Sequence, residues 1–278
     1  MTSQPVGLGP GDHAAWIFDG PAALDRAAER YLAEGLRAGD RCTYVLDEPP
    51  DLDRLAGLGD VERLVTEGRL GFRTVEEVYG ASRRPDLATL IAGVAEGVMA
   101  ARAQGFTGLR VVTDGTTLAD DTAEGRAHWL RWEQLVDGLA ASTAFVVMCA
   151  FDRRRLAPWV VEELCAVHPV VSAGPELPPF RVFAGGDGLT LVGAVDGLAA
   201  PLFRRVLAVA PPLDPLVVDL SATELLSHGA LEALAGTARH RAVVLRHARP
   251  IVQRLWALLD LPCPEVTFEP VGPATRTA

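Results

Sequence analysis

Several short apolar runs of this sequence begin or end in side chains that could bind a ligand. His13 opens the first run and Trp16 lies three positions later, while Asp114 and Asp152 each close a later run. Groups beyond the carboxyl ends of parallel strands line the usual binding crevice of an α/β sheet, so aspartates that converge there could hold a metal or a ligand. The alternative, which we favour for each one, is that it caps the following helix. The same two interpretations apply to Asp19 and Asp47.

A histidine and an aromatic ring at the mouth of a strand could bind a small molecule. Strand alternation places His13 and Trp16 on opposite faces, which predicts that one lies in the core and the other is exposed. Arg153 begins a run of three arginines directly after Asp152. These arginines could hold an anion, or they could form the solvated start of a helix, which is the interpretation we favour.

Cys149, Cys165 and His168 raise the question of a metal site. Cys165 and His168 are three positions apart and could share a helix face, and Cys149 could join them in space. Single buried cysteines are more often small core residues, so we expect no metal and no cofactor. The four cysteines are scattered without a CxxC pair, which is typical of a reduced, cytoplasmic protein.

The composition excludes several kinds of chemistry. All 26 basic residues are arginine, and the absence of lysine excludes a phosphate-loop lysine, a kinase strand lysine and a Schiff base. The motifs GxSxG and HExxH are also absent. The formal net charge is −10, without the basic surplus that nucleic-acid binding requires. No window approaches the roughly 18 to 20 uninterrupted apolar residues of a membrane helix. We therefore expect neither enzymatic activity nor a nucleic-acid or membrane partner.

The elements that must position these residues alternate in type along the first part of the chain. Runs rich in β-forming residues alternate with longer segments of Leu/Ala periodicity, which predicts a mostly parallel sheet with helices on its faces. The strands are expected at 13–19, 41–47, 70–75, 109–114 and 143–151, and the helices at 22–39, 86–105 and 124–140.

A Pro-rich segment, 174–179, separates this region from a shorter one. The shorter region opens with a Gly-rich hairpin and continues with alternating helices and strands. We expect the hairpin within 180–196, helices at 198–209, from Ser227 and at 249–260, and strands at 216–221 and 241–246. The predicted organisation is thus a domain over 1–173, a linker, a second α/β domain over 180–270 and a tail over 271–278.

Residues 10–173 resemble the MEDS domain, a sensory module named for methanogens, methylotrophs and a dichloromethane-response regulator. The resemblance rests on "GDHAAWIFD" and above all on "VVMCAFDRRRLAPWVVEELCAVHP", where the family pattern falls on Cys149, Phe151, Asp152, Arg153, His168 and Pro169. It implies a RecA-like α/β sandwich without ATPase motifs that senses a ligand. The candidate ligand-sensing residues are then His13, Trp16, Asp114, Cys149, Asp152, Arg153 and His168. The family often has a cysteine and a tyrosine after the opening histidine, and here only His13 matches.

Residues 178–270 resemble a STAS domain, the fold of anti-sigma-factor antagonists, in their element order and in the strand end "DLS". The resemblance implies a partner-docking surface around Ser221, Ser227 and His228. The family's phosphorylated serine falls on His228, which a serine kinase cannot phosphorylate. A displaced acceptor at Ser221 or Ser227 is one alternative, and a helix N-cap is the interpretation we favour for Ser227.

Together these features predict a non-enzymatic cytoplasmic regulator. A small-molecule sensor would control a domain that docks onto an anti-sigma factor or a related kinase-like protein. One alternative is an adaptor without a ligand, which predicts no enclosed pocket in residues 10–173. The other is a hydrolase or transferase, which predicts that His13, Asp114, Asp152 and His168 converge. A homodimer is compatible with the sequence, although nothing in the sequence specifies its interface.

Overall fold

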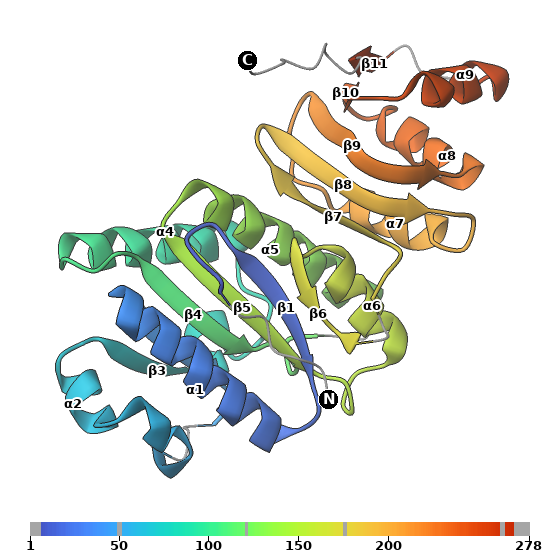
Figure 1. Ribbon diagram of the computed structural model, residues 1–278. Coiled ribbons are helices and arrows are strands. Elements are labelled where there is room, and N and C mark those ends of the chain that lie inside the picture. Colours follow the sequence, from blue (N-terminus) through green and yellow to red (C-terminus); the bar gives the residue numbers. More distant parts are fainter. Residues whose placement is uncertain (1–6, 49–51, 120–121, 175–176, 262–264, 270–278) are drawn as a thin grey trace, which may run out of the picture. The chain divides into compact units, whose positions relative to one another are not determined.

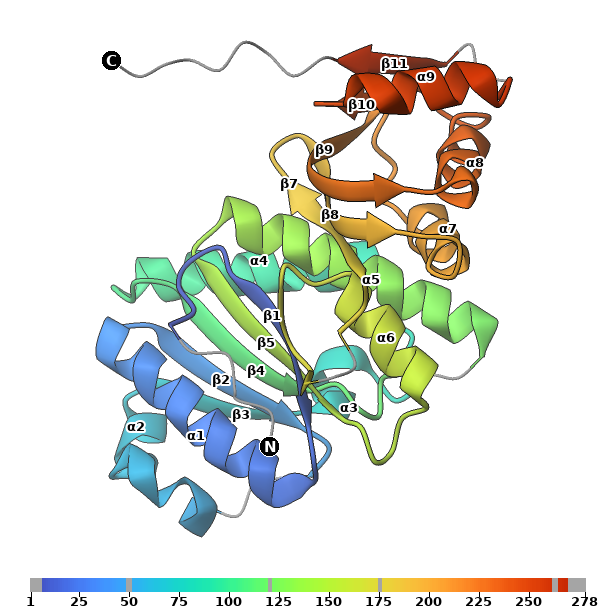
Figure 2. The same cartoon turned by 45° about the vertical axis from the view of Figure 1, so that its right-hand side comes forward.

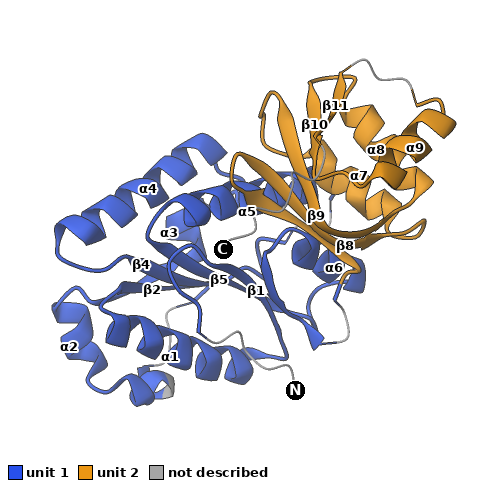
Figure 3. Ribbon diagram, turned by 45° about the horizontal axis from the view of Figure 1, so that its top comes forward, with its two compact units in different colours: residues 1–177 blue, residues 178–278 orange. Residues whose placement is uncertain are grey.

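The computed structural model describes residues 7–48, 52–119, 122–174, 177–261 and 265–269. It consists of two compact units, Met1–Leu177 and Pro178–Ala278, which are coloured separately in Figure 3. The division falls within the Pro-rich segment of the sequence. Each unit contains its own sheet, so each can be described by itself.

The first unit is built on a six-stranded parallel sheet with the order β3-β2-β4-β5-β1-β6. Its strands are β1 (His13–Phe18), β2 (Arg41–Leu46), β3 (Leu70–Thr74), β4 (Leu109–Asp114), β5 (Phe145–Asp152) and β6 (Val170–Ser172). Its helices are α1 (Pro21–Ala38), the 3-10 segment η1 (Leu52–Leu58), α2 (Val61–Thr66), α3 (Val75–Tyr79), α4 (Leu87–Ala103), α5 (Ala123–Ser142) and α6 (Pro158–Ala166).

Helices cover both faces of this sheet, with α1 on one side and α4, α5 and α6 on the other (Figures 1 and 2). The alternating side chains of each strand therefore enter two separate cores. Along β1, Trp16 packs in the core under α1, whereas Ile17 packs in the core under α5. His13 and Trp16 alternate as predicted, but both are buried. The expectation that one of them is exposed is wrong, because a parallel sheet of this kind has no solvated face.

The second unit has five strands in the order β11-β10-β9-β8-β7, in which only the β7–β8 pair is antiparallel. The strands are β7 (Phe180–Gly185), β8 (Gly188–Val195), β9 (Leu216–Leu226), β10 (Val243–Arg246) and β11 (Val266–Glu269). The helices α7 (Ala200–Ala208), α8 (His228–Thr237) and α9 (Pro250–Leu258) lie together on one face of the sheet (Figure 2). The predicted hairpin is confirmed, whereas β11 was not predicted.

The stretch between Ser221 and Ser227 differs from the prediction of a short polar link. It continues β9 to Leu226, paired with β8 through two irregularities in register. The exposed side chains of Ser221, Ala222 and Glu224 explain the error, because a strand that faces water on one side carries polar residues like a loop.

The fold class expected from the sequence is confirmed. The first unit is an α/β sandwich with a parallel sheet, consistent with a RecA-like domain, and a smaller α/β unit follows it. Among the residues that the structure describes, no helix combines the length and apolarity needed to cross a membrane.

Candidate functional site

Four buried side chains from distant parts of the chain meet inside the first unit. His13 Nε2 lies 3.3 Å from Glu133 Oε2, and the same carboxylate oxygen lies 3.5 Å from His168 Nε2. The sulfur of Cys149 lies 3.6 Å from His13 Nε2 and 3.5 Å from Glu133 Oε2. All four donor atoms lie within 4.8 Å of one another. We refer to these four residues as the His–Cys cluster.

Each member of the cluster is placed by a different element. His13 begins β1, and Cys149 lies on the neighbouring strand β5, where it pairs in register with Ala15. Glu133 comes from the buried face of α5, and His168 from the short link between α6 and β6. Parallel pairing brings the first two together, and packing of α5 and α6 on the same face of the sheet adds the others.

Asp137 extends the cluster one helical turn further along α5. Its Oδ1 lies 3.4 Å from Nδ1 of His13, and its side chain is buried. The ring of His13 therefore lies between two carboxylates, those of Glu133 and Asp137. The ring of His168 is held differently, because its Nδ1 lies 2.7 Å from the carbonyl oxygen of Leu164.

Burial and mutual contacts shift the pKa values of the cluster in different directions. Burial alone would lower the pKa of His13, but its contacts with Asp137, Cys149 and Glu133 raise that pKa well above the usual value. Burial and the neighbouring His13 lower the pKa of His168. Burial would raise the pKa of Glu133, but the two rings lower it to about 2. Burial raises the pKa of the Cys149 thiol to about 12. Burial and the mutual contacts therefore act in opposite directions on the two imidazoles, and they favour a carboxylate at Glu133 and a thiol at Cys149.

A cavity of about 740 Å³ adjoins the cluster at Cys149. It lies between the sheet and the helices α3, α4 and α5. Its inner wall contains Trp132, Val136, Phe145 and Val147, and Tyr79 packs edge-on against Trp132 with ring centroids 5.9 Å apart. The polar side chains of its lining come from the strands and from α3 and α4, and they include Arg41, Thr43, Arg73, Glu77, Thr89 and Thr113. The space is therefore mainly apolar, with a few polar groups.

The structure brings together three of the predicted ligand-sensing residues, His13, Cys149 and His168. Trp16 lies on the opposite face of the sheet, in the core under α1. Cys165 is buried near the cluster without belonging to it.

The other predicted residues lie at the carboxyl ends of the strands. Asp114 accepts a hydrogen bond from the N–H of Thr116 (3.0 Å), and burial raises its pKa. Asp152 binds the guanidinium of Arg154 (2.9 Å), and Arg153 approaches Asp19 (3.3 Å).

Helix capping, which we favoured for the strand-end aspartates, is wrong for Asp19, Asp114 and Asp152. The N-caps of α1, α5 and α6 are Gly20, Thr122 and Ala157. These three aspartates instead accept hydrogen bonds from, or pair with, side chains and turn N–H groups near the ends of the strands. Asp47 likewise accepts hydrogen bonds from Thr117 (2.8 Å) and Arg83 (3.2 Å).

Glu133 and Asp137 were missed by the sequence analysis. They lie four residues apart in "WEQLVDG", where the alternation of acids with apolar residues is typical of a helix with a solvated face. Their burial beside a histidine 120 or more positions away is a tertiary feature. The one available signal was that both acids share a helix face, at i and i+4.

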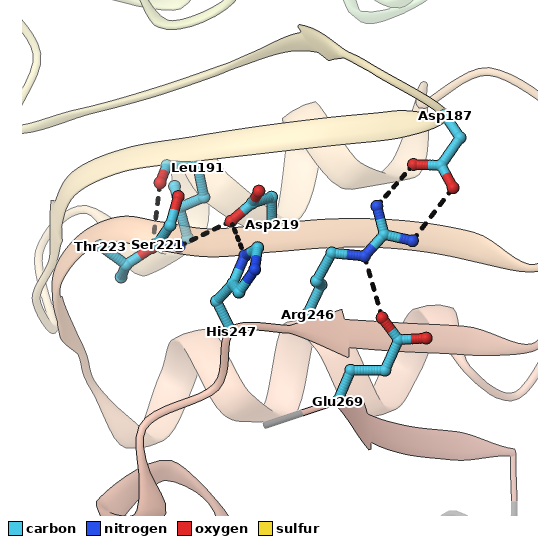
Figure 4. A network of polar contacts seen from close by, with 8 residues as sticks. All are labelled: Asp187, Leu191, Asp219, Ser221, Thr223, Arg246, His247 and Glu269. Atoms are coloured by element: carbon cyan, nitrogen blue, oxygen red, sulfur yellow. Dashed lines mark hydrogen bonds and ion pairs between the residues drawn. The ribbon is translucent and has the colours of Figure 1, made fainter. Parts of the chain in front are cut away.

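In the second unit, the predicted docking residues surround the start of α8 and the middle of β9. Ser227 is the N-cap of α8, with its Oγ 3.4 Å from the N–H of Ala230, as favoured from the sequence. His228 is exposed and lies 3.4 Å from Glu232 one turn later. Ser221 donates its N–H to Asp219 (2.7 Å), which also binds Nδ1 of His247 (3.0 Å), as shown in Figure 4.

The same face of the second sheet carries a second polar group, also drawn in Figure 4. The guanidinium of Arg246 binds Asp187 on the β7–β8 turn (2.7 Å) and Glu269 on β11 (2.9 Å). These contacts connect β10 with its neighbour β11 and, past β9, with the β7–β8 turn.

Comparison with known proteins identifies the first unit. The family model described as "MEthanogen/methylotroph, DcmR Sensory domain" (MEDS) matches residues 12–169, more than half of the chain and the whole His–Cys cluster. No curated protein matches the chain significantly. Among solved structures, the chain is similar to the flagellar accessory protein FlaH from Methanocaldococcus jannaschii, with 15% identity and a TM-score of 0.38. That match covers 66% of this chain and 76% of FlaH.

Proposed function

This chain belongs to the MEDS family, and from that membership we propose that it is a non-enzymatic signalling regulator whose first unit binds a small molecule. The observation that carries the proposal is the cavity that ends at Cys149 of the His–Cys cluster. A sensory role follows from the family. The cavity supplies the place where a signal molecule would bind.

The size and lining of the cavity indicate the kind of ligand. A volume of about 740 Å³ is within the roughly 300–1,000 Å³ of small-molecule sites. The inner wall is apolar and aromatic, whereas the polar side chains, among them Thr43, Thr113 and Glu77, line the rest of the space. The ligand we propose is therefore a small, mostly apolar molecule with one or two polar groups.

Helix α4 is the element best suited to respond to that ligand. It is rich in apolar residues, yet only Val98 and Ala101 of its side chains are buried. Gly93 and Gly97 line the cavity from this helix, and each glycine in a helix interior costs roughly 0.5–1 kcal/mol relative to alanine. A ligand that fills the space would add the packing that α4 lacks. Its affinity would then differ between a closed and a looser position of α4, as a signalling ligand requires.

The second unit is proposed as the output, a STAS-like docking domain for an anti-sigma factor or a related kinase-like regulator. The order of its elements and the Asp219–Ser221 segment support this assignment. With His228 at the position expected for the phosphorylated serine, docking would depend on the state of the first unit and not on a serine kinase. The surface around Ser221, Ser227 and His228 is the proposed contact.

The two alternatives have less support. An adaptor without a ligand predicts no enclosed pocket in residues 10–173, and the space under α4, although large, opens to solvent beside exposed residues such as Asp86 and Thr89, so its size alone favours a ligand. A hydrolase or transferase needs the strand-end aspartates near the histidines. His13 and His168 share a cluster with Glu133 and Cys149, while Asp114 and Asp152 bind turn and side-chain groups at the carboxyl ends of their strands.

A pair of variants on α4 tests the proposal. Gly93 lines the cavity, and a Cβ there would meet no atom of the described residues within 4 Å, so a leucine side chain can be added at this edge of the cavity without a clash. Gly93→Leu also replaces a poor helix former by a good one, so the variant should fold. Ala92→Leu is the matched control, because position 92 is exposed and does not line the cavity.

The measurement is ligand-observed 19F NMR of the full chain with a library of small fluorinated fragments. We expect apolar fragments with one polar group to bind the wild type and Ala92→Leu, and to bind Gly93→Leu at least tenfold more weakly. Equal binding to all three proteins would show that the fragments bind outside the cavity, which would contradict the proposal. So would a folded wild-type protein that binds none of them.

A further inference from the structure

We propose that the His–Cys cluster is a tetrahedral metal site in which His13, Glu133, Cys149 and His168 bind one divalent ion, with Zn²⁺ the best-matched ion. This inference concerns the cluster itself and is independent of the ligand proposed for the cavity. It departs from the expectation of no metal, which rested on the fact that single buried cysteines are more often small core residues.

The distances between the donor atoms match those around a tetrahedral ion. Metal–nitrogen and metal–oxygen bonds of about 2.0–2.2 Å and a metal–sulfur bond of about 2.3 Å place neighbouring donors about 3.3–3.6 Å apart. Four of the six separations among His13 Nε2, His168 Nε2, Glu133 Oε2 and Cys149 Sγ run from 3.3 to 3.6 Å, and the other two are no longer than 4.8 Å. A hydrogen bond between nitrogen and oxygen would be about 2.7–3.0 Å, so the two nitrogen–oxygen separations, 3.3 and 3.5 Å, are long for hydrogen bonds and fit an ion between the donors. The two contacts of the sulfur, 3.5 and 3.6 Å, fit a metal site and a thiol hydrogen bond equally well.

The tautomer of His168 leaves a lone pair that needs a cation. Its Nδ1 lies 2.7 Å from the carbonyl oxygen of Leu164, which can only accept, so Nδ1 carries the proton. In the neutral ring with this tautomer, Nε2 presents a lone pair to the carboxylate of Glu133 at 3.5 Å. This buried nitrogen has no hydrogen-bond partner among the described residues. Two acceptors that face each other in a buried site repel, and an ion between them would remove the repulsion.

Outer contacts hold both imidazoles in the orientation that metal ligands adopt. Histidines that bind a metal through one nitrogen usually donate the other N–H to a carboxylate or a backbone carbonyl. His13 faces Asp137 with its Nδ1, and His168 faces Leu164 in the same way. Each ring thus turns Nε2 toward the centre of the cluster.

The donor types select among ions. One sulfur, two imidazole nitrogens and one carboxylate oxygen suit Zn²⁺, whereas Mg²⁺ and Ca²⁺ prefer oxygen donors throughout. Cys149 would bind as the thiolate and release its proton to solvent as the metal–sulfur bond forms. The thiolate and the Glu133 carboxylate then balance the charge of the ion, which a buried site requires. The ion would join α5, β1, β5 and the α6–β6 link.

Co²⁺ is a suitable probe, because it replaces Zn²⁺ at tetrahedral sites and its absorption reports on geometry and sulfur ligation. The full chain, freed of metal, is titrated with Co²⁺ and then with Zn²⁺. We expect one Co²⁺ per chain, strong d–d bands, a thiolate-to-Co²⁺ charge-transfer band, and loss of all bands as Zn²⁺ displaces Co²⁺.

Three variants identify the ligands. Cys149→Ser should lose the charge-transfer band and bind at least tenfold more weakly. Asp137→Asn should keep the band and weaken affinity by about 10–100-fold, the usual effect of a residue that positions a metal-bound histidine. Cys42→Ser is the matched control, because Cys42 is an equally buried cysteine in the other core of the same unit. Cys42→Ser should have the Co²⁺ affinity and the charge-transfer band of the wild type. Circular dichroism checks the fold of each variant.

Two results would overturn the proposal. One is a folded wild-type protein that binds no Co²⁺, with His13 held as an imidazolium between Glu133 and Asp137. The other is a Co²⁺ spectrum without the thiolate band, or with a thiolate band that only Cys42→Ser removes. If Cys149→Ser does not fold, two measurements still test the proposal. They are the thiolate-to-Co²⁺ band of the wild type and the weaker Co²⁺ affinity expected of Asp137→Asn.

Discussion

At the scale of single residues, Asp219 shows how the second unit fixes its proposed docking face. Burial alone would raise the pKa of this carboxyl group, but hydrogen bonds from His247 and from the N–H of Ser221 lower it below the usual value. His247 adopts a left-handed backbone conformation, with a φ of 56°, which costs a non-glycine residue of order 1 kcal/mol. The contact with Asp219 offsets part of that cost and holds the loop after β10 against β9 (Figure 4).

The variant His247→Ala should therefore raise the pKa of Asp219 toward its ordinary value of 3.8. A carboxyl group with a lowered pKa in the folded state contributes stability above its ordinary pKa, and that contribution is lost as the pH falls through the lowered value. The second unit of the wild type should therefore lose more stability between pH 5 and pH 2 than the variant does.

The measurement is a carboxyl ¹³C NMR titration of Asp219 in the full chain. His240→Ala is the control, since His240 is an exposed histidine of the same unit outside this network. An unchanged Asp219 pKa in His247→Ala would show that the ring does not act on the carboxylate.

At the scale of elements, the start of α8 depends on the side chain of Ser227. As the N-cap it accepts a hydrogen bond from the N–H of Ala230, at the long end of the range (3.4 Å). Ser227→Ala should lower the free energy of unfolding of the second unit by about 0.5–1 kcal/mol, the lower part of the range for lost N-caps. Ser227→Asp should keep the stability of the wild type, because aspartate caps equally well and its charge suits a helix N-terminus.

Urea unfolding of the full chain, followed by the fluorescence of Trp256 in α9, measures both variants. Because the first unit holds the other four tryptophans, both variants are made in a background in which these four are replaced by phenylalanine, so that Trp256 alone reports on the second unit. A destabilised Ser227→Asp would contradict the capping role.

The sequence predicted most elements because their patterns are local. The parallel sheet of the first unit follows from apolar runs that alternate with Leu/Ala-periodic helices, and the β7–β8 hairpin follows from Gly185 to Gly188. The second half of β9 was missed because its polar side chains face solvent. β11 was missed because Val266–Glu269 is short and pairs only with β10.

Three residues of the candidate site were predicted from the sequence, and the two acids beside them were not, because only tertiary packing distinguishes those acids from others. His13, Cys149 and His168 stand out as rare polar types at element ends. Glu133 and Asp137 are two of many acids on helices, and only the packing of α5 against β1 buries them. The cavity was beyond prediction, because it depends on how loosely α4 covers β2 and β4.

At the scale of the whole molecule, the first unit has features suited to the proposed binding of a signal molecule, and the second has features suited to the proposed docking of a partner. The first has a cavity, a buried polar cluster and a poorly packed helix above them. The second presents polar groups on one face of a mixed sheet, with its helices on the other face. A regulator needs both a place to bind its signal and a surface to transmit it. The central claim is that the signal binds in the cavity under α4.

Native mass spectrometry tests this claim most directly, on the full chain purified from its natural host under gentle and denaturing conditions. The account predicts an organic adduct that is lost on denaturation in the wild type and in Ala92→Leu, but is absent from Gly93→Leu. A bound metal, if the cluster holds one, would add the same mass to all three proteins and would not be confused with the ligand. The same organic adduct on Gly93→Leu, or none on a folded wild-type protein, would contradict the account.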